Sequence, residues 1–274
     1  MTLKKILILC LASLTLSSCE TVIELDFNDA DPILVIEATL TNESGPYLVK
    51  LSESAAFYDD NIYPPRTDAT VIISDNLGNS ETLSELAPGS YLTEITQGSP
   101  GVTYTLSIST NGETFEASST MPEEIIPIDG LQVDFEEESI FADEGYYVTA
   151  YLTDPPQEGN NYRLKFFRNG DPYIFLDDVD STETVDTNLY LSNDKFFNGN
   201  QVDVDFDNVV QVGDTVTIEV NHLDLSTFDY YRTLSDAILG GGVAPSDPVS
   251  NFEDKALGYF GAYTVGRMSV IIEE

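Results

Sequence analysis

Apolar and polar residues alternate with the period of a β-strand through most of the first half of the chain. Within Tyr104–Ile108, for example, apolar residues alternate strictly with Thr and Ser, which indicates one buried and one solvated face. Asn111-Gly112 is a strong hairpin signal. Strand patterns of this kind cover Ile33–Leu40, Tyr47–Ser52, Ala69–Ser74, Ser80–Leu83, Tyr91–Ile95, Thr103–Ser109 and Thr114–Ser119. About seven strands at turn spacings of roughly 8–12 residues predict an Ig-like or transthyretin-like β-sandwich over residues 33–121.

Two prolines, Pro122 and Pro127, enclose an acidic stretch and interrupt this pattern. We expect a domain boundary there and a second β-rich domain over residues 128–274. Strand patterns in this half cover Gly130–Phe135, Gly145–Leu152, Asn161–Phe167, Gln201–Phe206, Asp214–Val220 and Met268–Ile272. The segment Ala256–Tyr263 is predicted as a loop that leads into the last of these strands. The expected fold class is therefore mostly β.

One α-helix is predicted near residues 226–239. Phe228, Tyr231, Leu234 and Ile238 recur at helical spacing and form one apolar face. Ser226 is the expected N-cap, with Asp229 at the capping-box position. Gly240–Gly242 follow as residues that tolerate the left-handed conformation of a helix end.

The first 18 residues have the pattern of a secretory signal peptide. Lys4 and Lys5 precede an apolar run from Ile6 to Leu16. Such a run is too short to cross a bilayer, which requires about 20 residues. Leu16-Ser17-Ser18-Cys19 resembles the bacterial lipobox, which implies cleavage before Cys19 and acylation of that cysteine with palmitate-type chains. Several acyl chains anchor a protein stably. Residues 19–32 would form the lipidated tether.

The residue after the cysteine bears on localisation. An Asp at this position would resemble an inner-membrane retention signal, but the residue is Glu20. An outer-membrane lipoprotein of the cell envelope is therefore favoured. Whether it faces the periplasm or the cell surface stays open.

The charge balance limits the classes of partner. Lys and Arg total 11 against 48 Asp and Glu, giving a net charge of −37. Because nucleic-acid binding requires cations that neutralise phosphates, nucleic acid is excluded as an expected partner. The two cysteines are Cys10, in the leader, and Cys19. The body therefore has no expected disulfide, thiolate metal site or catalytic cysteine, and no cofactor is expected.

Candidate chemistry is sparse, and we expect a protein that is not an enzyme. His222 is the one histidine and is interpreted as structural rather than catalytic. A glycan hydrolase with two carboxylates is kept as an alternative, because carboxylates are abundant.

Two acidic clusters could be interpreted as calcium sites. Asp203, Asp205 and Asp207 alternate with apolar residues, and at strand period they simply share a solvated face, which is the favoured interpretation. A second cluster, formed by Asp177, Asp178 and Asp180, has the same ambiguity.

The aromatic segment near the C-terminus is a candidate partner-docking loop. Tyr259, Phe260 and Tyr263 are flanked by Gly258 and Gly261, which would allow a loop to project. The competing interpretation buries these rings in the core, where aromatic residues usually lie, and it is the favoured one.

The chain resembles the Bacteroidota lipoproteins known as domain of unknown function 4249. The segments that carry the resemblance are Cys19, Ile33–Glu37, Thr153–Pro156, Asn161–Arg163, Gly213–Val216, Tyr230-Tyr231, Asn251-Phe252 and Ala256–Ala262. The resemblance implies an envelope lipoprotein and carries no catalytic residues. It also implies proximity to TonB-dependent outer-membrane receptors. We therefore expect a binding or accessory module held at the membrane through Cys19, beside an outer-membrane β-barrel transporter. A structural envelope scaffold is the further alternative.

Overall fold

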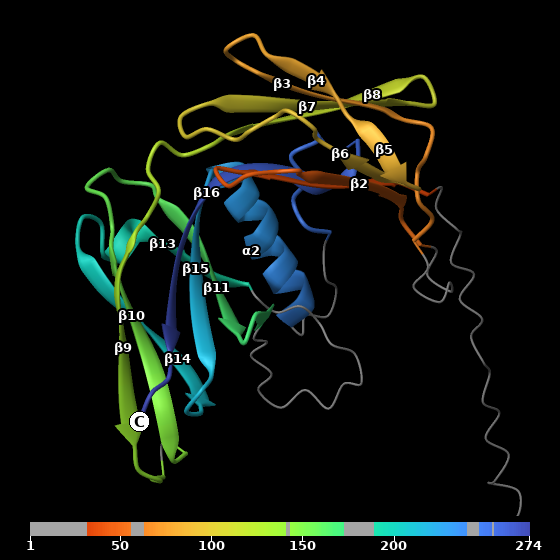
Figure 1. Ribbon diagram of the computed structural model, residues 1–274. Helices are drawn as coiled ribbons and strands as arrows, with labels where there is room; N and C mark the ends of the chain where they lie inside the picture. Colours follow the sequence, from red (N-terminus) through yellow and green to blue (C-terminus); the bar gives the residue numbers. More distant parts are fainter. Residues whose placement is uncertain (1–31, 56–62, 141–142, 173–188, 240–246, 254) are drawn as a thin grey trace, which may run out of the picture. The chain divides into compact units, whose positions relative to one another are not determined.

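Across the residues that the structure describes, the fold consists of three hydrogen-bonded β-sheets and an α-helix (Figure 1). The computed structural model describes residues 32–55, 63–140, 143–172, 189–239, 247–253 and 255–274. Its elements are β1 (Leu34–Thr41), β2 (Leu48–Glu53), β3 (Thr70–Asp75), β4 (Ser80–Thr82), β5 (Ser84–Ala87), β6 (Ser90–Leu92), β7 (Thr103–Thr110), β8 (Glu113–Thr120), β9 (Ile128–Glu136), β10 (Gly145–Thr153), β11 (Asn161–Arg168), β12 (Asp171–Pro172), β13 (Tyr190–Asn193), the 3₁₀ turn η1 (Asp194–Phe196), β14 (Gln201–Val210), β15 (Thr215–Leu223), α2 (Leu225–Leu239) and β16 (Leu257–Ile271). The expectation of a mostly β fold with one helix is confirmed for these residues.

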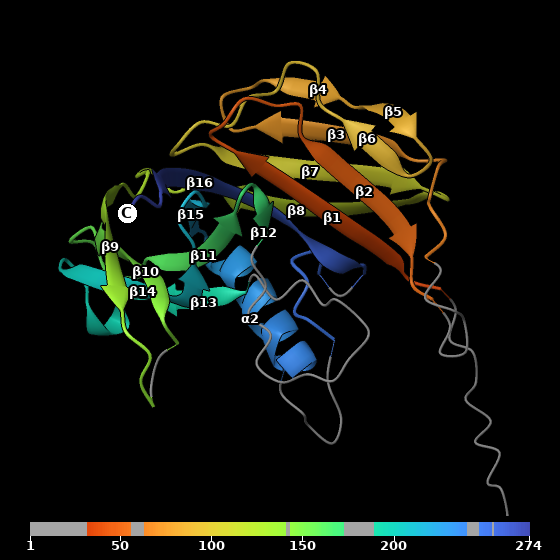
Figure 2. The ribbon, with the colours of Figure 1, turned by 60° about the horizontal axis from the view of Figure 1, so that its bottom comes forward.

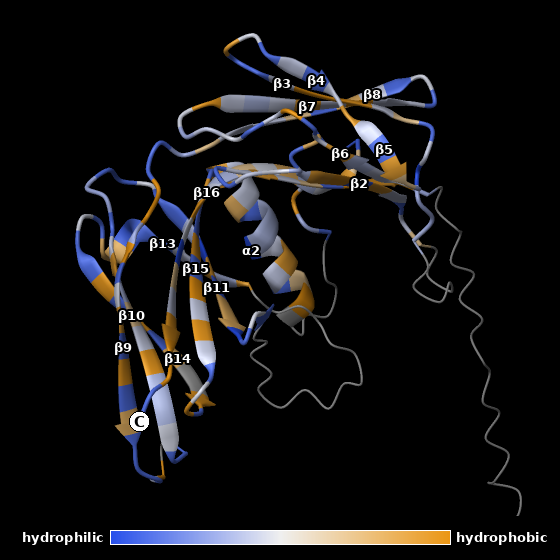
Figure 3. Cartoon of the chain, viewed as in Figure 1, coloured by the Kyte–Doolittle hydropathy of each residue, from blue (hydrophilic) through white to orange (hydrophobic). Residues whose placement is uncertain are grey.

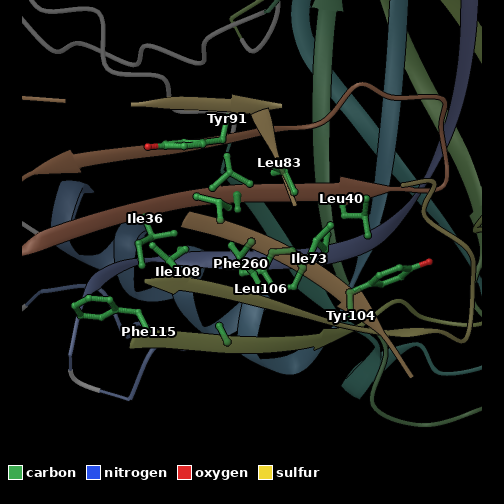
Figure 4. Close-up of a cluster of buried hydrophobic side chains, with 14 of the residues drawn as sticks. Ile36, Leu40, Ile73, Leu83, Tyr91, Tyr104, Leu106, Ile108, Phe115 and Phe260 are labelled. Carbon is green, nitrogen blue, oxygen red and sulfur yellow. The ribbon is translucent and has the colours of Figure 1, made fainter. Parts of the chain in front are cut away.

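The first sandwich packs one sheet, β4-β3-β7-β8, against a second that contains β1, β2, β6 and β5. Their inward-facing side chains form one apolar core (Figure 4). Alternation on β7 explains this packing: Tyr104, Leu106 and Ile108 are buried while the Thr and Ser residues between them are not. Burial of alternate residues on both sheets is what the strand periodicity of residues 33–121 predicts.

The second sandwich pairs the three-stranded sheet β14-β10-β9 with β11, β15 and the end of β16. Hydrophobic bands, in orange, alternate with pale or blue bands along β9, β10 and β15 (Figure 3). Val148, Phe166, Phe206 and Ile218 lie in its core and are almost completely buried.

Strand β16 belongs to both sandwiches. Its first half, from Leu257 to Tyr263, pairs in parallel with β1, and its second half, from Thr264, pairs antiparallel with β15 (Figure 2). Gly258 permits the contact with β1, because it has a φ of +91° and a Cβ there would lie 1.9 Å from the carbonyl oxygen of Ile36. Both sandwiches therefore share one continuous sheet.

This shared strand bears on two expectations. The predicted loop at Ala256–Tyr263 is wrong, because Leu257 onward is a strand. The interval Pro122–Pro127 does separate β8 from β9, yet β16 crosses that boundary to pair with β1. Phe252 and Phe260 from the C-terminal segment lie in the core of the first sandwich.

Helix α2 is capped two residues earlier than the sequence suggested. Asp224 is the N-cap, since its Oδ1 accepts a hydrogen bond of 3.0 Å from the backbone N–H of Thr227, and Ser226 bonds to the other carboxylate oxygen. The predicted N-cap role of Ser226 is therefore wrong. Phe228 and Tyr231 are buried as predicted, whereas Ile238 is exposed. Gly240–Gly242 lie outside the described residues.

Candidate functional site

The aromatic residues of β16 point alternately to opposite faces of the shared sheet. Phe260 is 1% exposed and lies in the core of the first sandwich (Figure 4). Tyr259 and Tyr263 point to the other face, where they pack with tyrosines of α2. The helix approaches this face closely, because a Cβ at Gly261 would lie 2.8 Å from Thr227.

A cavity of about 380 Å³ lies between α2 and the shared sheet, and we call it the tyrosine pocket. Its wall combines aromatic, charged and apolar side chains from β1, β11, β12, α2 and β16, together with Leu189. They are Glu37 and Thr39 of β1; Arg163, Lys165 and Phe167 of β11; Pro172; Leu189; Tyr230, Tyr231 and Leu234 of α2; and Tyr259 and Tyr263 of β16. A concave site with a few convergent polar groups is the usual form of a small-molecule site.

The phenols of the pocket are fixed by contacts with one another. The hydroxyl groups of Tyr231 and Tyr259 share a hydrogen bond of 2.6 Å, and that of Tyr259 lies 3.2 Å from Thr39 Oγ1. The rings of Tyr230 and Tyr259 stack with centroids 4.4 Å apart. Tyr259 is the half-buried member of this group and lines the cavity.

A group of cations lies beside these rings. The guanidinium of Arg163 is buried and lies 4.3 Å from the centroid of the Tyr231 ring, a cation–π contact. Lys165 Nζ lies 3.2 Å from Glu219, whose second oxygen binds Arg267 at 2.5 Å. Burial would raise the pKa of Glu219, but Lys165, Asn221 and Arg267 outweigh it and hold that pKa below its usual value. The buried carboxylate is therefore ionised and positions Lys165.

Tyr230, Tyr231 and Tyr263 are neutral phenols at neutral pH. Burial raises the pKa of Tyr230, Tyr231 and Tyr263 above the ordinary tyrosine value, and the neighbouring Tyr259 adds to this. A phenol with a raised pKa is a poor general base at neutral pH. Glu37 is the one carboxylate among the described residues that line the pocket, whereas glycoside hydrolysis uses a pair.

The candidate docking loop is a strand in the structure. Tyr259, Phe260 and Tyr263 lie on a strand, and burial of Phe260 in one core and of Tyr263 beneath α2 contradicts a projecting loop. The physical reason is the pairing with β1, which the glycines permit. A contact between Tyr259 and a partner stays a prediction.

His222 is buried at the end of β15. Its Nδ1 lies 3.1 Å from the backbone oxygen of Glu124, and its ring packs against Tyr162, whose hydroxyl binds Asp154. Burial lowers the pKa of His222, so the ring is neutral near pH 7. These contacts fit the structural interpretation.

Some of the remaining candidate residues, those for lipidation and for calcium binding, lie outside the residues that the structure describes. Cys19 and the cluster Asp177, Asp178 and Asp180 lie outside the described residues. Asp203 and Asp205 are exposed on β14; Asp207 lies in the same strand, and its side chain is outside what the structure describes. No group of three or more His, Cys, Asp and Glu residues suited to a metal occurs among the residues with described positions.

Sequence reasoning missed Arg163 and Glu219 as parts of the site. Arg163 was noted for the family resemblance alone, in the segment Asn161–Arg163. A usable signal existed, because Arg163 and Lys165 alternate with apolar residues of β11 and Glu219 sits within an apolar strand. Charges at such positions are usually paired when buried.

Comparison with known proteins identifies the family of the chain. Residues 20–269 match the family model described as domain of unknown function (DUF4249). No curated protein matches the chain.

Proposed function

The chain belongs to the DUF4249 family, and we propose that it is a lipid-anchored outer-membrane protein with a non-catalytic binding role. The tyrosine pocket would take a small organic ligand rich in hydroxyl or carbonyl groups. An accessory role beside a TonB-dependent outer-membrane barrel is part of the proposal.

The proposed anchor rests on the N-terminal sequence. The leader ends in Leu16-Ser17-Ser18-Cys19, and acyl chains on Cys19 would hold the body at a bilayer. Among the described residues, no helix is long and apolar enough to cross a membrane. On this proposal the lipid supplies the attachment of the body.

The proposed binding role rests on one observation, the construction of the tyrosine pocket. Its polar groups are pre-positioned, since the Tyr231–Tyr259 hydrogen bond and the Arg163–Tyr231 contact fix them before a ligand arrives. Pre-organisation reduces the entropy lost on binding. Phenol and guanidinium groups supply hydrogen bonds, and the neighbouring rings supply apolar surface.

Membrane fractionation tests the anchor. Cys19→Ala should move the protein from the membrane pellet to the soluble fraction, while Cys10→Ala, in the leader, should leave it in the pellet. A Cys19→Ala protein that sediments as fully as the wild type would contradict lipid anchoring.

A thermal-shift screen with mono- and disaccharides and amino acids tests the pocket. A ligand that raises the melting temperature of the wild type should fail to do so for Tyr259→Ala. Tyr63→Ala, at an exposed position of the first sandwich, is the control and should retain the response. If Tyr259→Ala responds like the wild type, the ligand binds elsewhere.

Co-purification tests the accessory role. Mild solubilisation of outer membranes should yield the protein together with a β-barrel receptor. Recovery of the protein alone, with the receptor intact in the same extract, would favour the structural scaffold instead.

A further inference from the structure

The three-stranded sheet of the second sandwich has two edge strands, β9 and β14, and among the described strands each pairs with β10 alone. Just before β9 the chain approaches β16 so closely that a Cβ at Gly266 would lie 2.2 Å from the carbonyl oxygen of Ile126. At the β14 edge, β13 ends one sheet and β14 ends the other. The side of β14 that faces away from β10 therefore presents backbone N–H and C=O groups.

A cavity of about 220 Å³ lies between these two edge strands, and we call it the edge pocket. Its wall is mainly apolar and includes Val202 and Val204 of β14, Leu164 of β11 and Phe197. Tyr190 of β13 also lines it and is half exposed, which places an aromatic side chain where a partner can reach it.

The two faces of β14 differ in chemistry. Val202, Val204 and Phe206 point into the sandwich, whereas Asp203 and Asp205 are exposed on the outer face. In a sheet, residues of a neighbouring strand meet side chains of the same face. A strand added beside β14 would therefore place one set of side chains over the edge pocket and the alternate set beside the two aspartates.

We propose that β14 is a docking edge for an extended segment of a partner protein in which apolar residues alternate with Lys or Arg. Its apolar side chains enter the edge pocket, its cations pair with Asp203 and Asp205, and its backbone extends the sheet by hydrogen bonding to β14.

Charge argues against the most obvious competitor, a second copy of this chain. Pairing of β14 with itself would bring aspartates of both copies onto the same face, and like charges opposite one another destabilise a sheet. The net charge of −37 adds to this repulsion. Acidic residues on an edge thus suppress self-pairing while attracting a basic strand.

The test uses the full chain, purified in detergent, and a fluorescent eight-residue peptide that alternates Val and Lys. Fluorescence anisotropy should show binding that weakens as salt rises. The double variant D203K/D205K should lower the affinity at least tenfold and should gain binding to a peptide that alternates Val and Glu. The variant D134K/E136K, on exposed positions of β9, makes the same change in net charge and should leave the affinity unchanged.

A second arm tests the backbone component. In an extended peptide, N–H groups of alternate residues point to the same edge. N-methylation of alternate residues therefore blocks hydrogen bonding along one edge and leaves the other edge intact. Of the two peptides methylated in this way, the one whose β14-facing edge is blocked should not bind. Three results would overturn the proposal: no binding of the Val-Lys peptide by the wild type, equal losses in both charge variants, or full binding of both N-methylated peptides.

Discussion

The side chain of Asn251 binds both backbone polar groups of Phe260. Its Nδ2 donates to the carbonyl oxygen at 2.8 Å, and its Oδ1 accepts from the N–H at 3.0 Å. The carboxamide thus replaces a neighbouring strand on the edge of β16 that β1 leaves unpaired. Asn42, just beyond the end of β1, likewise binds both backbone polar groups of Val265. Its Oδ1 accepts from the N–H at 2.6 Å, and its Nδ2 donates to the carbonyl oxygen at 3.3 Å.

Replacing Asn251 by Ala should therefore cost about 1–3 kcal/mol of unfolding free energy, since two buried backbone groups lose their partner. Urea denaturation measures the change. Lys255→Ala, an exposed position in the same segment, is the control and should be neutral. Equal stability of Asn251→Ala and the wild type would mean that water replaces the carboxamide.

Phe260→Ala should destabilise the protein by about 3–5 kcal/mol, because it opens a cavity in the core of the first sandwich. Thermal denaturation followed by circular dichroism measures this. Tyr259→Phe, which removes a hydroxyl group from the opposite face, should cost far less. A Phe260→Ala protein with an unchanged melting temperature would restore the docking interpretation.

Alanine substitutions at two glycines with positive φ distinguish the cost of backbone strain from the cost of a steric clash. Gly112 has a φ of +80° with nothing within 4 Å of an added Cβ, so Gly112→Ala should cost only the left-handed strain, about 1–2 kcal/mol. Gly258→Ala adds a clash with the carbonyl oxygen of Ile36 and should prevent β1–β16 pairing. We expect soluble Gly112→Ala protein and little or no soluble Gly258→Ala protein; similar yields would contradict the close approach.

Glu81 should make stability depend on acidic pH. Burial would raise its pKa, but the hydroxyl of Thr96 and the backbone N–H groups of residues 94–96 outweigh burial and lower it. A carboxylate with a lowered folded pKa stabilises the protein above its unfolded pKa and loses that contribution as pH falls through the folded pKa. Glu81→Gln should therefore be less stable than the wild type at pH 7, with the difference shrinking in the acid range. Glu116→Gln, at an exposed position of β8, is the control and should leave the stability at pH 7 unchanged.

The segment 33–121 expressed alone should not fold. It lacks β16, which pairs with β1, and the core residues Phe252 and Phe260. We expect a disordered NMR spectrum for this fragment and one cooperative thermal transition for the full body. A well-dispersed spectrum would support an independent domain that ends near Pro122.

Local patterns predicted local structure well. The run Ile33–Leu40 became β1 and the helical spacing around Phe228 became α2, because each depends on which residues of one segment are buried. The loop prediction for Ala256–Tyr263 was wrong because the structure of this segment depends on contacts with distant parts of the chain. Its glycines resemble a loop, yet they are required by close contacts with Ile36 and Thr227, which are distant in sequence.

The tyrosine pocket was foreseen only in fragments. Tyr259 and Tyr263 were candidates, but on the wrong kind of element. The contacts of Arg163 with Tyr231 and of Lys165 with Glu219 join residues on different elements, so no spacing within one segment reveals them.

The shared strand also determines how the body would carry a mechanical load. If the chain is anchored at Cys19, a pull from the membrane enters β1 at its N-terminal end, because the chain runs from the anchor through Pro32 into Leu34. A partner that holds the second sandwich pulls on β16 from beyond Tyr263. The two parallel strands are then drawn in opposite directions along their length, and every hydrogen bond between them resists together. Force applied between the membrane and the partner would load this ladder in shear rather than open it one bond at a time.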